Sequence, residues 1–104
     1  MIHQVILAKF AEGIKDEEIE RLMRQTRMQL LKIPDVLTVR CGKKLQADQE
    51  WPFFVALEYD SKAKQGMVHD HPVYVKYREL LTESTESHQM LFFEMEPYKN
   101  VDHS

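Results

Sequence analysis

Three segments of this chain are apolar at both odd and even positions, and this feature limits the possible folds more than any other. In residues 2–10, Val5 and Leu7 alternate with Ile6 and Ala8. The same two-sided pattern recurs in residues 53–59 and 90–95. Successive side chains of a strand point to opposite faces of a sheet, so a strand that is apolar on both faces needs cover on both. The sequence therefore predicts a sheet whose central strands are shielded from water on each side.

A helical period follows the first strand. Across residues 16–32, apolar side chains recur at steps of three and four, which predicts a helix with one buried stripe. This stripe consists of Ile19, Leu22, Met23, Thr26, Leu30 and Ile33. Asp16 and Glu17 lie in the first turn, where the helix dipole favours negative charge. Pro34 ends the helix, because the residue before a proline is disfavoured in the helical conformation.

The rest of the chain continues this alternation of strands and helices. We predict a strand over 36–42, a loop over 43–52, a strand over 53–59, a short helix over 62–68, a helix that starts at Pro72, a polar loop over 82–87 and a strand over 90–95. Ser61 suits the N-cap of the short helix, and proline is favoured at the first helical position. The order β-α-β-β-α-β is that of a ferredoxin-like α+β fold, with an antiparallel four-stranded sheet and both helical segments on one face.

Helices on one face leave the other face of the sheet without cover. That face would expose several large apolar side chains, and leaving them in water forfeits on the order of 10 kcal/mol. This is comparable to the whole stability of a small domain. A second copy of the chain offers a self-complementary cover, so we expect a homodimer in which two sheets pair into an α/β barrel. A monomer with an exposed patch, or a flap formed by the C-terminal tail, is the alternative.

Composition narrows the functional classes. The 104 residues suit one domain, which we place at residues 1–97, with a tail over 98–104. The formal net charge of −3 offers no basic surface for nucleic acid or for an anionic membrane. The single cysteine, Cys41, excludes an intrachain disulfide and fits a reducing compartment. Because the N-terminus lacks the features of a secretory signal and no segment has the length of a membrane span, we expect a cytoplasmic protein.

Several short motifs, taken in their order along the chain, resemble one family. They are Ile2-His3-Gln4-Val5-Ile6-Leu7-Ala8-Lys9-Phe10, Gly13 before the acidic helix start, Lys32-Ile33-Pro34-Asp35-Val36, His71-Pro72 and the aromatic Leu91-Phe92-Phe93-Glu94. Together they span residues 1–97 and are similar to the stress-responsive A/B barrel (Dabb) domains. This resemblance implies a dimeric α+β barrel, which agrees with the packing argument.

The resemblance also bears on chemistry. Members of the family include a plant polyketide cyclase, in which a tyrosine and a histidine act as an acid–base pair in a pocket between sheet and helices. The resemblance places the family's first-strand histidine on His3. The positions of the catalytic tyrosine and histidine fall on Val68 and Tyr74, and a further pocket histidine falls on Phe53. Since the working pair is not carried over, we do not expect cyclase activity by that route.

Three polar residues are candidates for a catalytic or binding site. His3 could act as a general base, because the pKa of histidine lies near neutrality; a histidine bound by the strand-end backbone is the structural alternative. His71 could cap the last helix or face a cavity, and Ser, Thr, Asp or Asn is the more usual N-cap. Tyr74 could donate its phenolic proton to a ligand oxygen, or line the core.

Four hypotheses for function follow. The leading one is a binding domain that holds a small apolar or aromatic molecule between the sheet and the helices. Its expected apolar lining is Val5, Leu7, Met23 and Val55. The second is a cofactor-free cyclase, lyase or isomerase that uses His3, His71 and Tyr74. The third is a monooxygenase of the same architecture. Proteins of that class resemble one another in having a pocket asparagine, and here the only asparagine is Asn100 in the tail. The fourth is a structural dimer without a ligand.

Metal and thiol chemistry have little support. The motif His69-Asp70-His71 offers two imidazoles, whereas a zinc site needs three or four ligands, some of them from a distant element. Cys41 shares the apolar side of its strand with Leu37 and Val39, which indicates a buried thiol without an activating base. We therefore expect no metal and no cofactor.

Overall fold

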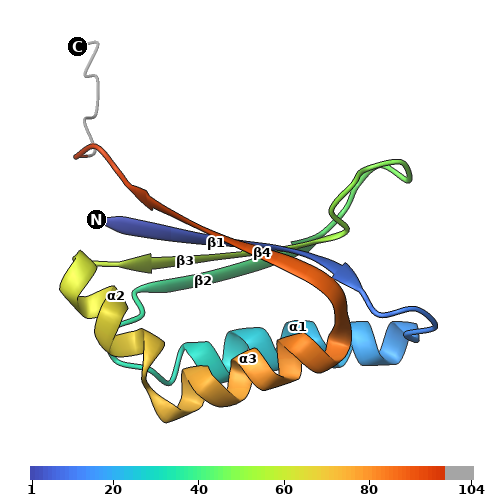
Figure 1. The fold of residues 1–104 in the computed structure, drawn as a ribbon, viewed down its shortest axis with the longest axis horizontal. Helices are drawn as coiled ribbons and strands as arrows, with labels where there is room; N and C mark the ends of the chain where they lie inside the picture. Colours follow the sequence, from blue (N-terminus) through green and yellow to red (C-terminus); the bar gives the residue numbers. More distant parts are fainter. Residues whose placement is uncertain (98–104) are drawn as a thin grey trace, which may run out of the picture.

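The chain forms one four-stranded sheet with all of its helices on one face (Figure 1). The computed structural model describes residues 1–97. Its elements are β1 (Ile2–Phe10), α1 (Asp16–Leu30), β2 (Thr38–Lys43), β3 (Phe53–Tyr59), α2 (Lys62–His69), α3 (Pro72–Ser84) and β4 (Thr85–Glu94). The expected tail over 98–104, with Asn100, lies outside the described residues. Within the described part, every helix is too short or too polar to cross a membrane.

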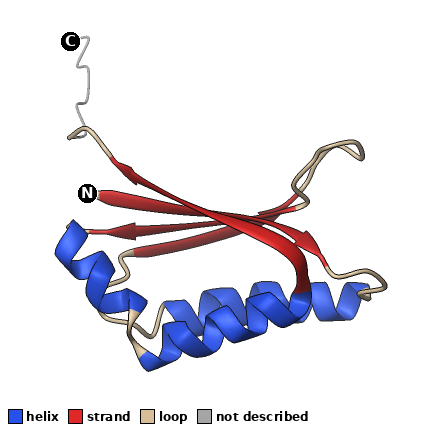
Figure 2. Cartoon of the chain, viewed as in Figure 1, coloured by secondary structure: helices blue, strands red, loops and turns tan. Residues whose placement is uncertain are grey.

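The strand order is β2-β3-β1-β4, and all neighbouring strands are antiparallel. β1 is therefore a central strand, with β3 on one side and β4 on the other. The fold has two layers, the sheet and the helices on one of its faces. Figure 2 shows that no helix covers the second face of the sheet. This arrangement confirms the predicted ferredoxin-like α+β class.

Local signals set most of the element ends. Ser61 caps α2, because its Oγ accepts a hydrogen bond from the backbone N–H of Lys64 at 3.2 Å. Pro72 occupies the first turn of α3, where its missing N–H costs nothing. Gly13 has a φ of 78° in the turn that joins β1 to α1, a conformation that glycine adopts without strain. These ends agree with the sequence prediction.

The polar loop predicted over 82–87 is wrong. Helix α3 continues to Ser84, and β4 begins at the next residue, Thr85. The Thr85 Oγ1 donates a hydrogen bond to the Leu81 carbonyl at 2.6 Å, and the Ala11 N–H donates one to the Ser84 carbonyl at 3.0 Å. These bonds satisfy the end of the helix, and pairing with β1 then holds the polar segment 86–89 as a strand. Local polarity misled the prediction because the partner strand is distant in the sequence.

The two faces of the sheet differ in their surroundings. On β1, Gln4, Ile6 and Ala8 are buried against the helices, whereas Val5 and Leu7 lie half-buried on the opposite, outer face. Strand register extends this division to the neighbouring strands. The apolar side chains of the outer face are Val5, Leu7, Phe54, Ala56, Leu91 and Phe93. Two-sided apolar strands, expected from the sequence, are therefore present.

Candidate functional site

The structure separates the residues that the sequence analysis grouped into one pocket. His3, Val5 and Leu7 lie on the outer face of the sheet, whereas Val55 is buried on the inner face. The expectation that Val5 and Leu7 line a cavity between sheet and helices is wrong. Side chains alternate along a strand, so a shift of one residue in the assumed phase moves a whole set to the other face.

His3 has an acidic neighbour rather than a catalytic partner. It pairs across the strands with Glu58, and its Nε2 lies 3.7 Å from the Glu58 Oε2. Both side chains are partly exposed at one end of the outer face. Tyr74 is buried on the other side of the sheet, so His3 and Tyr74 share no cavity.

Gln4, the residue next to His3, takes the inward position. Its side chain is fully buried, and its Oε1 accepts a hydrogen bond from the Tyr59 hydroxyl at 2.6 Å. Its Nε2 donates to the Tyr74 hydroxyl oxygen at 2.8 Å. These bonds form a chain of buried polar groups that runs across the inner face of the sheet from β3 to α3. A buried amide with both ends bonded is held in one orientation, which fixes the two phenols as well.

Tyr74 ends this chain with a weakly satisfied donor. Its hydroxyl donates to the thioether sulfur of Met90 at 3.8 Å. Sulfur in a thioether is a weak acceptor. Burial raises the pKa of Tyr74 above its usual range, and the Gln4 hydrogen bond and the Arg78 charge offset only part of that rise. At neutral pH the phenol is therefore a protonated donor that lacks a good acceptor among the residues described.

Met90 separates this donor from an open groove between α3 and β4. The groove has a volume of about 560 Å³. It is lined by Val75, Arg78, Glu79, Thr82, Glu83, His88 and Met90. We call it the α3–β4 groove. Met90 therefore both accepts from Tyr74 and lines the groove, and movement of this flexible side chain would connect the two.

Arg78 stands beside Tyr74 in the wall of this groove. Its guanidinium carbon lies 5.4 Å from the centroid of the Tyr74 ring, a cation–π distance. Its Nη1 lies 3.3 Å from the Nε2 of His69. Because arginine carries only donors, the His69 Nε2 is the acceptor in this contact.

His71 is used by the fold. It is the N-cap of α3, and its Nδ1 accepts a hydrogen bond from the Val73 N–H at 3.2 Å. A ring nitrogen that accepts this bond is not available as a base while the cap is formed. Of the two roles that the sequence allowed for His71, the structure shows the helix cap.

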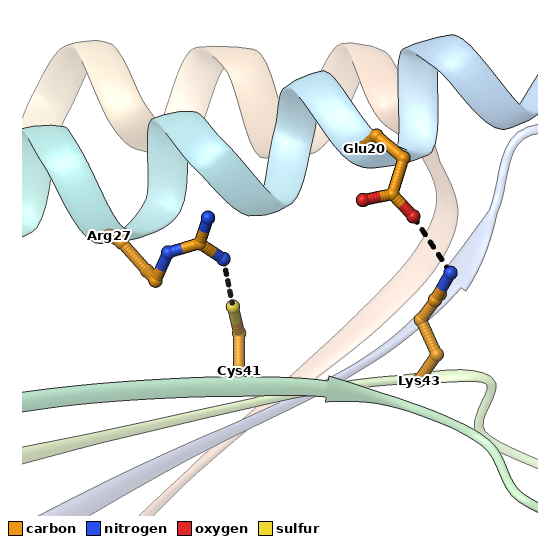
Figure 3. Close-up of polar contacts among 4 residues, drawn as sticks. All are labelled: Glu20, Arg27, Cys41 and Lys43. Carbon is orange, nitrogen blue, oxygen red and sulfur yellow. Dashed lines mark hydrogen bonds and ion pairs between the residues drawn. The ribbon is translucent and has the colours of Figure 1, made fainter.

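The opposite margin of the sheet–helix layer, between α1 and β2, is closed by side chains (Figure 3). Lys43 donates to Glu20 at 2.8 Å, and the Arg27 Nη1 lies 3.8 Å from the Cys41 sulfur. The Cys41 thiol in turn donates to the Met23 carbonyl at 3.8 Å. Cys41 is half-buried on the helix side of β2, whereas the sequence predicted a buried thiol. The predicted lining residue Met23 thus packs in this margin, away from the α3–β4 groove.

Further hollows lie elsewhere on the described surface, and two of them adjoin residues discussed above. One, of about 580 Å³, opens where β1 and α1 meet the loop before β3, and Lys9, Lys43 and Lys44 line it. Lys43 and Lys44 are bonded to Glu20 and the Ala47 carbonyl, and Lys9 lies 5.2 Å from the Trp51 ring. The other, of about 520 Å³, lies beside His3 and Glu58 on the outer face. Within residues 1–97, no group of three or more potential metal ligands comes together.

Sequence reasoning missed Gln4, Arg78 and Met90. A signal for Gln4 was present, because it lies in phase with Ile2, Ile6 and Ala8 and is the polar member of that buried set. No local signal identifies Arg78 or Met90, because their roles depend on how closely β4 approaches α3. Tyr59 and Tyr77 are buried, as expected for packing residues.

Solved structures share this fold at low sequence identity. A protein from Arabidopsis thaliana has a TM-score of 0.84 and 18% identity, over 96% of this chain and 100% of that chain. A dimeric ferredoxin-like protein of unknown function from Thermobifida fusca has a TM-score of 0.81 and 16% identity, over 90% of each chain. A hydroxynitrile lyase from Passiflora edulis has a TM-score of 0.83 and 9% identity, over 95% of this chain and 96% of that chain. At such identities the likeness shows the fold alone.

The family is shown by the sequence itself. No curated protein matches the chain at a significant level. Residues 2–97, however, match the family described as Stress responsive A/B Barrel Domain. This match covers nearly all of the 104 residues and agrees with the predicted resemblance. The chain belongs to the stress-responsive A/B barrel domain family.

Proposed function

We propose that the chain works as a homodimer whose subunits pair through the outer face of the sheet. The centre of this face is apolar, and Phe54 and Phe93 on it are 41% and 48% exposed. Burying such a face offers on the order of 10 kcal/mol, and a two-fold axis lets one surface serve both partners. The similar protein from Thermobifida fusca is dimeric, which supports the proposal.

Solution mass with a charge placed in the interface tests the dimer. Phe54→Lys puts two ammonium groups into the contact, and we expect it to weaken association by at least about two orders of magnitude. Leu45→Lys is the matched control, because Leu45 is 96% exposed in the loop before β3. Sedimentation equilibrium should give two chains for the natural protein and the control. A stable single copy of the natural protein at micromolar concentration would contradict the proposal.

We further propose that each subunit binds a small, mostly apolar or aromatic molecule at the α3–β4 groove, where it reaches Tyr74. One observation supports this most directly: the buried Tyr74 hydroxyl donates to a sulfur atom at 3.8 Å. A carbonyl or hydroxyl oxygen of a ligand is a better acceptor and would replace that sulfur when Met90 turns aside. The Gln4 amide holds the phenol in place for this exchange.

Binding is tested with a neutral aromatic ketone, 2-acetylnaphthalene, and protein labelled with ¹³C at the methionine methyl groups. We expect a saturable shift of the Met90 methyl signal. Tyr74→Phe removes the donor and should weaken binding by about two- to ten-fold, the worth of one neutral hydrogen bond. Tyr77→Phe is the control, since the Tyr77 hydroxyl is hydrogen-bonded to Thr26 at 2.8 Å. If the Met90 signal stays fixed up to the solubility limit of the ketone, the binding proposal fails.

The geometry favours binding over acid–base catalysis by the predicted residues. Such catalysis needs a base within reach of the same cavity as Tyr74. His3 lies on the other face of the sheet, and the Nδ1 of His71 accepts a backbone N–H. The group that bonds the Tyr74 hydroxyl is the amide of Gln4, which does not take up a proton at neutral pH.

A further inference from the structure

We infer that the ligand of the α3–β4 groove carries one carboxylate, which Arg78 binds, and that the rest of the ligand is uncharged and apolar. This inference rests on the proposed binding function and specifies its ligand class. It depends on the charge balance of Arg78 and on the charges that line the groove.

Arg78 is a partly buried cation without an anionic partner. Its Nε is shielded from solvent and has no hydrogen-bond partner within residues 1–97. None of the ion pairs formed by the described residues includes it. Its guanidinium contacts the face of the Tyr74 ring and the His69 imidazole, and neither brings a negative charge. Partly buried charges are normally paired, and a guanidinium fork matches a carboxylate with two parallel hydrogen bonds.

Among the described residues that line the groove, Arg78 is the only lysine or arginine, and the exposed carboxylates of Glu79 and Glu83 line it as well. Arg78 lies on α3 close to Tyr74 and Met90, whereas the exposed Glu83 lies further along α3, toward its C-terminal end. At a rise of about 1.5 Å per residue, their backbones are separated by more than one helical turn. One carboxylate of a ligand can therefore pair with Arg78, whereas a second carboxylate in the groove would be repelled by Glu79 or Glu83. A ligand with a single carboxylate fits this pattern, and a ligand with a carboxylate at each end does not.

The apolar contacts lie next to the cationic end. Val75 of α3 and Met90 of β4 line the groove together with Arg78. An aromatic or aliphatic body attached to the carboxylate can pack against both. Its oxygen would lie near the Tyr74 hydroxyl, so that Arg78 and Tyr74 act on the same end of the ligand.

The test compares three probes with one ring system. They are naphthalene-2-carboxylate, the neutral 2-acetylnaphthalene and naphthalene-2,6-dicarboxylate. Binding is followed by calorimetry and by the ¹³C signal of the Met90 methyl. We expect the monocarboxylate to bind on the order of ten-fold more tightly than the ketone, because its hydrogen bonds to Arg78 are charge-assisted. We expect the dicarboxylate to bind more weakly than the monocarboxylate.

Substitutions separate the roles of the charges. Arg78→Gln should remove the preference for the monocarboxylate over the ketone. Lys76→Gln, at an exposed position of the same helix, is the matched control and should preserve the preference. Glu83→Gln changes an exposed side chain and should raise the affinity for the dicarboxylate, so the charge pattern can be tested even if Arg78 variants fold poorly.

The outcomes distinguish this inference from the function on which it rests. Equal affinity for ketone and monocarboxylate, or a preference that persists in Arg78→Gln, overturns the inference while ketone binding upholds the proposed function. Binding of none of the probes overturns both. A dicarboxylate that binds as tightly as the monocarboxylate, with no response to Glu83→Gln, overturns the charge pattern that the inference assumes.

Discussion

The two margins of the sheet–helix layer are built differently. On the β2 side, α1 is joined to the strand by the Glu20–Lys43 pair at 2.8 Å and by the contact of Arg27 with Cys41 at 3.8 Å (Figure 3). On the β4 side, α3 and the strand leave a groove of about 560 Å³ between them. Side chains therefore bridge the β2 edge, where a hollow of about 580 Å³ opens beside Lys43 at the end of the strand, whereas the groove at the β4 edge adjoins Tyr74 through Met90. A small molecule would reach the buried hydroxyl groups from the β4 side.

The difference follows from how the chain enters β4. Because α3 passes into β4 without a loop, the strand starts at the end of the helix and diverges from it across the molecule (Figure 1). His88 and Phe92 point to the helix side of the sheet, yet both are exposed. α1, by contrast, is separated from β2 by residues 31–37 and can lie along the strand. Topology thus gives the two edges unequal cover.

The largest expected contrast is between core residues at the two margins. Leu22 of α1 is 1% exposed, and Leu22→Ala should lower the free energy of unfolding by about 2–5 kcal/mol, through lost burial and a cavity. Met90→Ala at the half-buried open margin should cost about 1 kcal/mol. Urea unfolding at matched protein concentration measures both. Equal losses would mean that the open margin is packed as firmly as the closed one.

A second contrast concerns the two phenols of α3. Tyr74→Phe leaves the Gln4 Nε2 without its oxygen acceptor, so we expect a loss of about 1–3 kcal/mol. Tyr77→Phe leaves the Thr26 hydroxyl still bonded to the Leu22 carbonyl at 2.7 Å, and the loss should be about 1 kcal/mol or less. The same unfolding measurement checks the order. A smaller loss for Tyr74→Phe would show that water already satisfies Gln4 from the groove.

Alkaline pH sharpens the comparison. Burial raises the pKa of both Tyr74 and Tyr77; a hydrogen bond offsets part of the rise at each, and the Arg78 charge lowers only the pKa of Tyr74. Tyrosines ionise at a lower pH in the unfolded chain than in the folded protein. The stabilisation from each buried phenol is therefore complete below the usual tyrosine pKa and falls by up to about 1.4 kcal/mol per pH unit above it. In the folded protein Tyr74 should ionise before Tyr77. Phenolate absorbance of Tyr74→Phe and Tyr77→Phe identifies the earlier step.

The smallest effect is expected from the exposed ion pair of the closed margin. Lys43 lowers the pKa of Glu20, so the pair contributes above the usual glutamate pKa and is lost as the pH falls below the lowered value. Both side chains are about half exposed. Glu20→Gln should therefore leave the melting temperature at pH 7 within the scatter of repeats, as is usual for surface pairs. A clear drop would show that this pair, rather than packing, keeps the margin closed.

Much of the fold was predictable because its signals are local. Both ends of the strand over 53–59 were predicted correctly, because Pro52 precedes its apolar run and Asp60 follows it. The buried stripe of α1 was also right, from Leu22 to Leu30. Helix ends at Ser61 and Pro72 follow from capping preferences. Each of these depends on residues within one turn or one strand.

The candidate site was harder to predict because it depends on phase and on distant partners. Both faces of β1 are apolar, so composition alone does not say whether His3 or Gln4 points to the helices. The start of β4 at Thr85 depends on pairing with β1, more than seventy residues earlier in the chain. The groove itself is set by the path of β4 relative to α3. Such relations appear only when the strands are paired.

The direct passage of α3 into β4 also places two surfaces on one strand. Met90 faces the groove, and the next residue, Leu91, faces the outer surface proposed as the subunit contact. Adjacent peptide units therefore serve both surfaces, with no flexible connection between helix and strand to absorb a change in either. A displacement of the strand at one surface therefore also moves the side chains of the other surface.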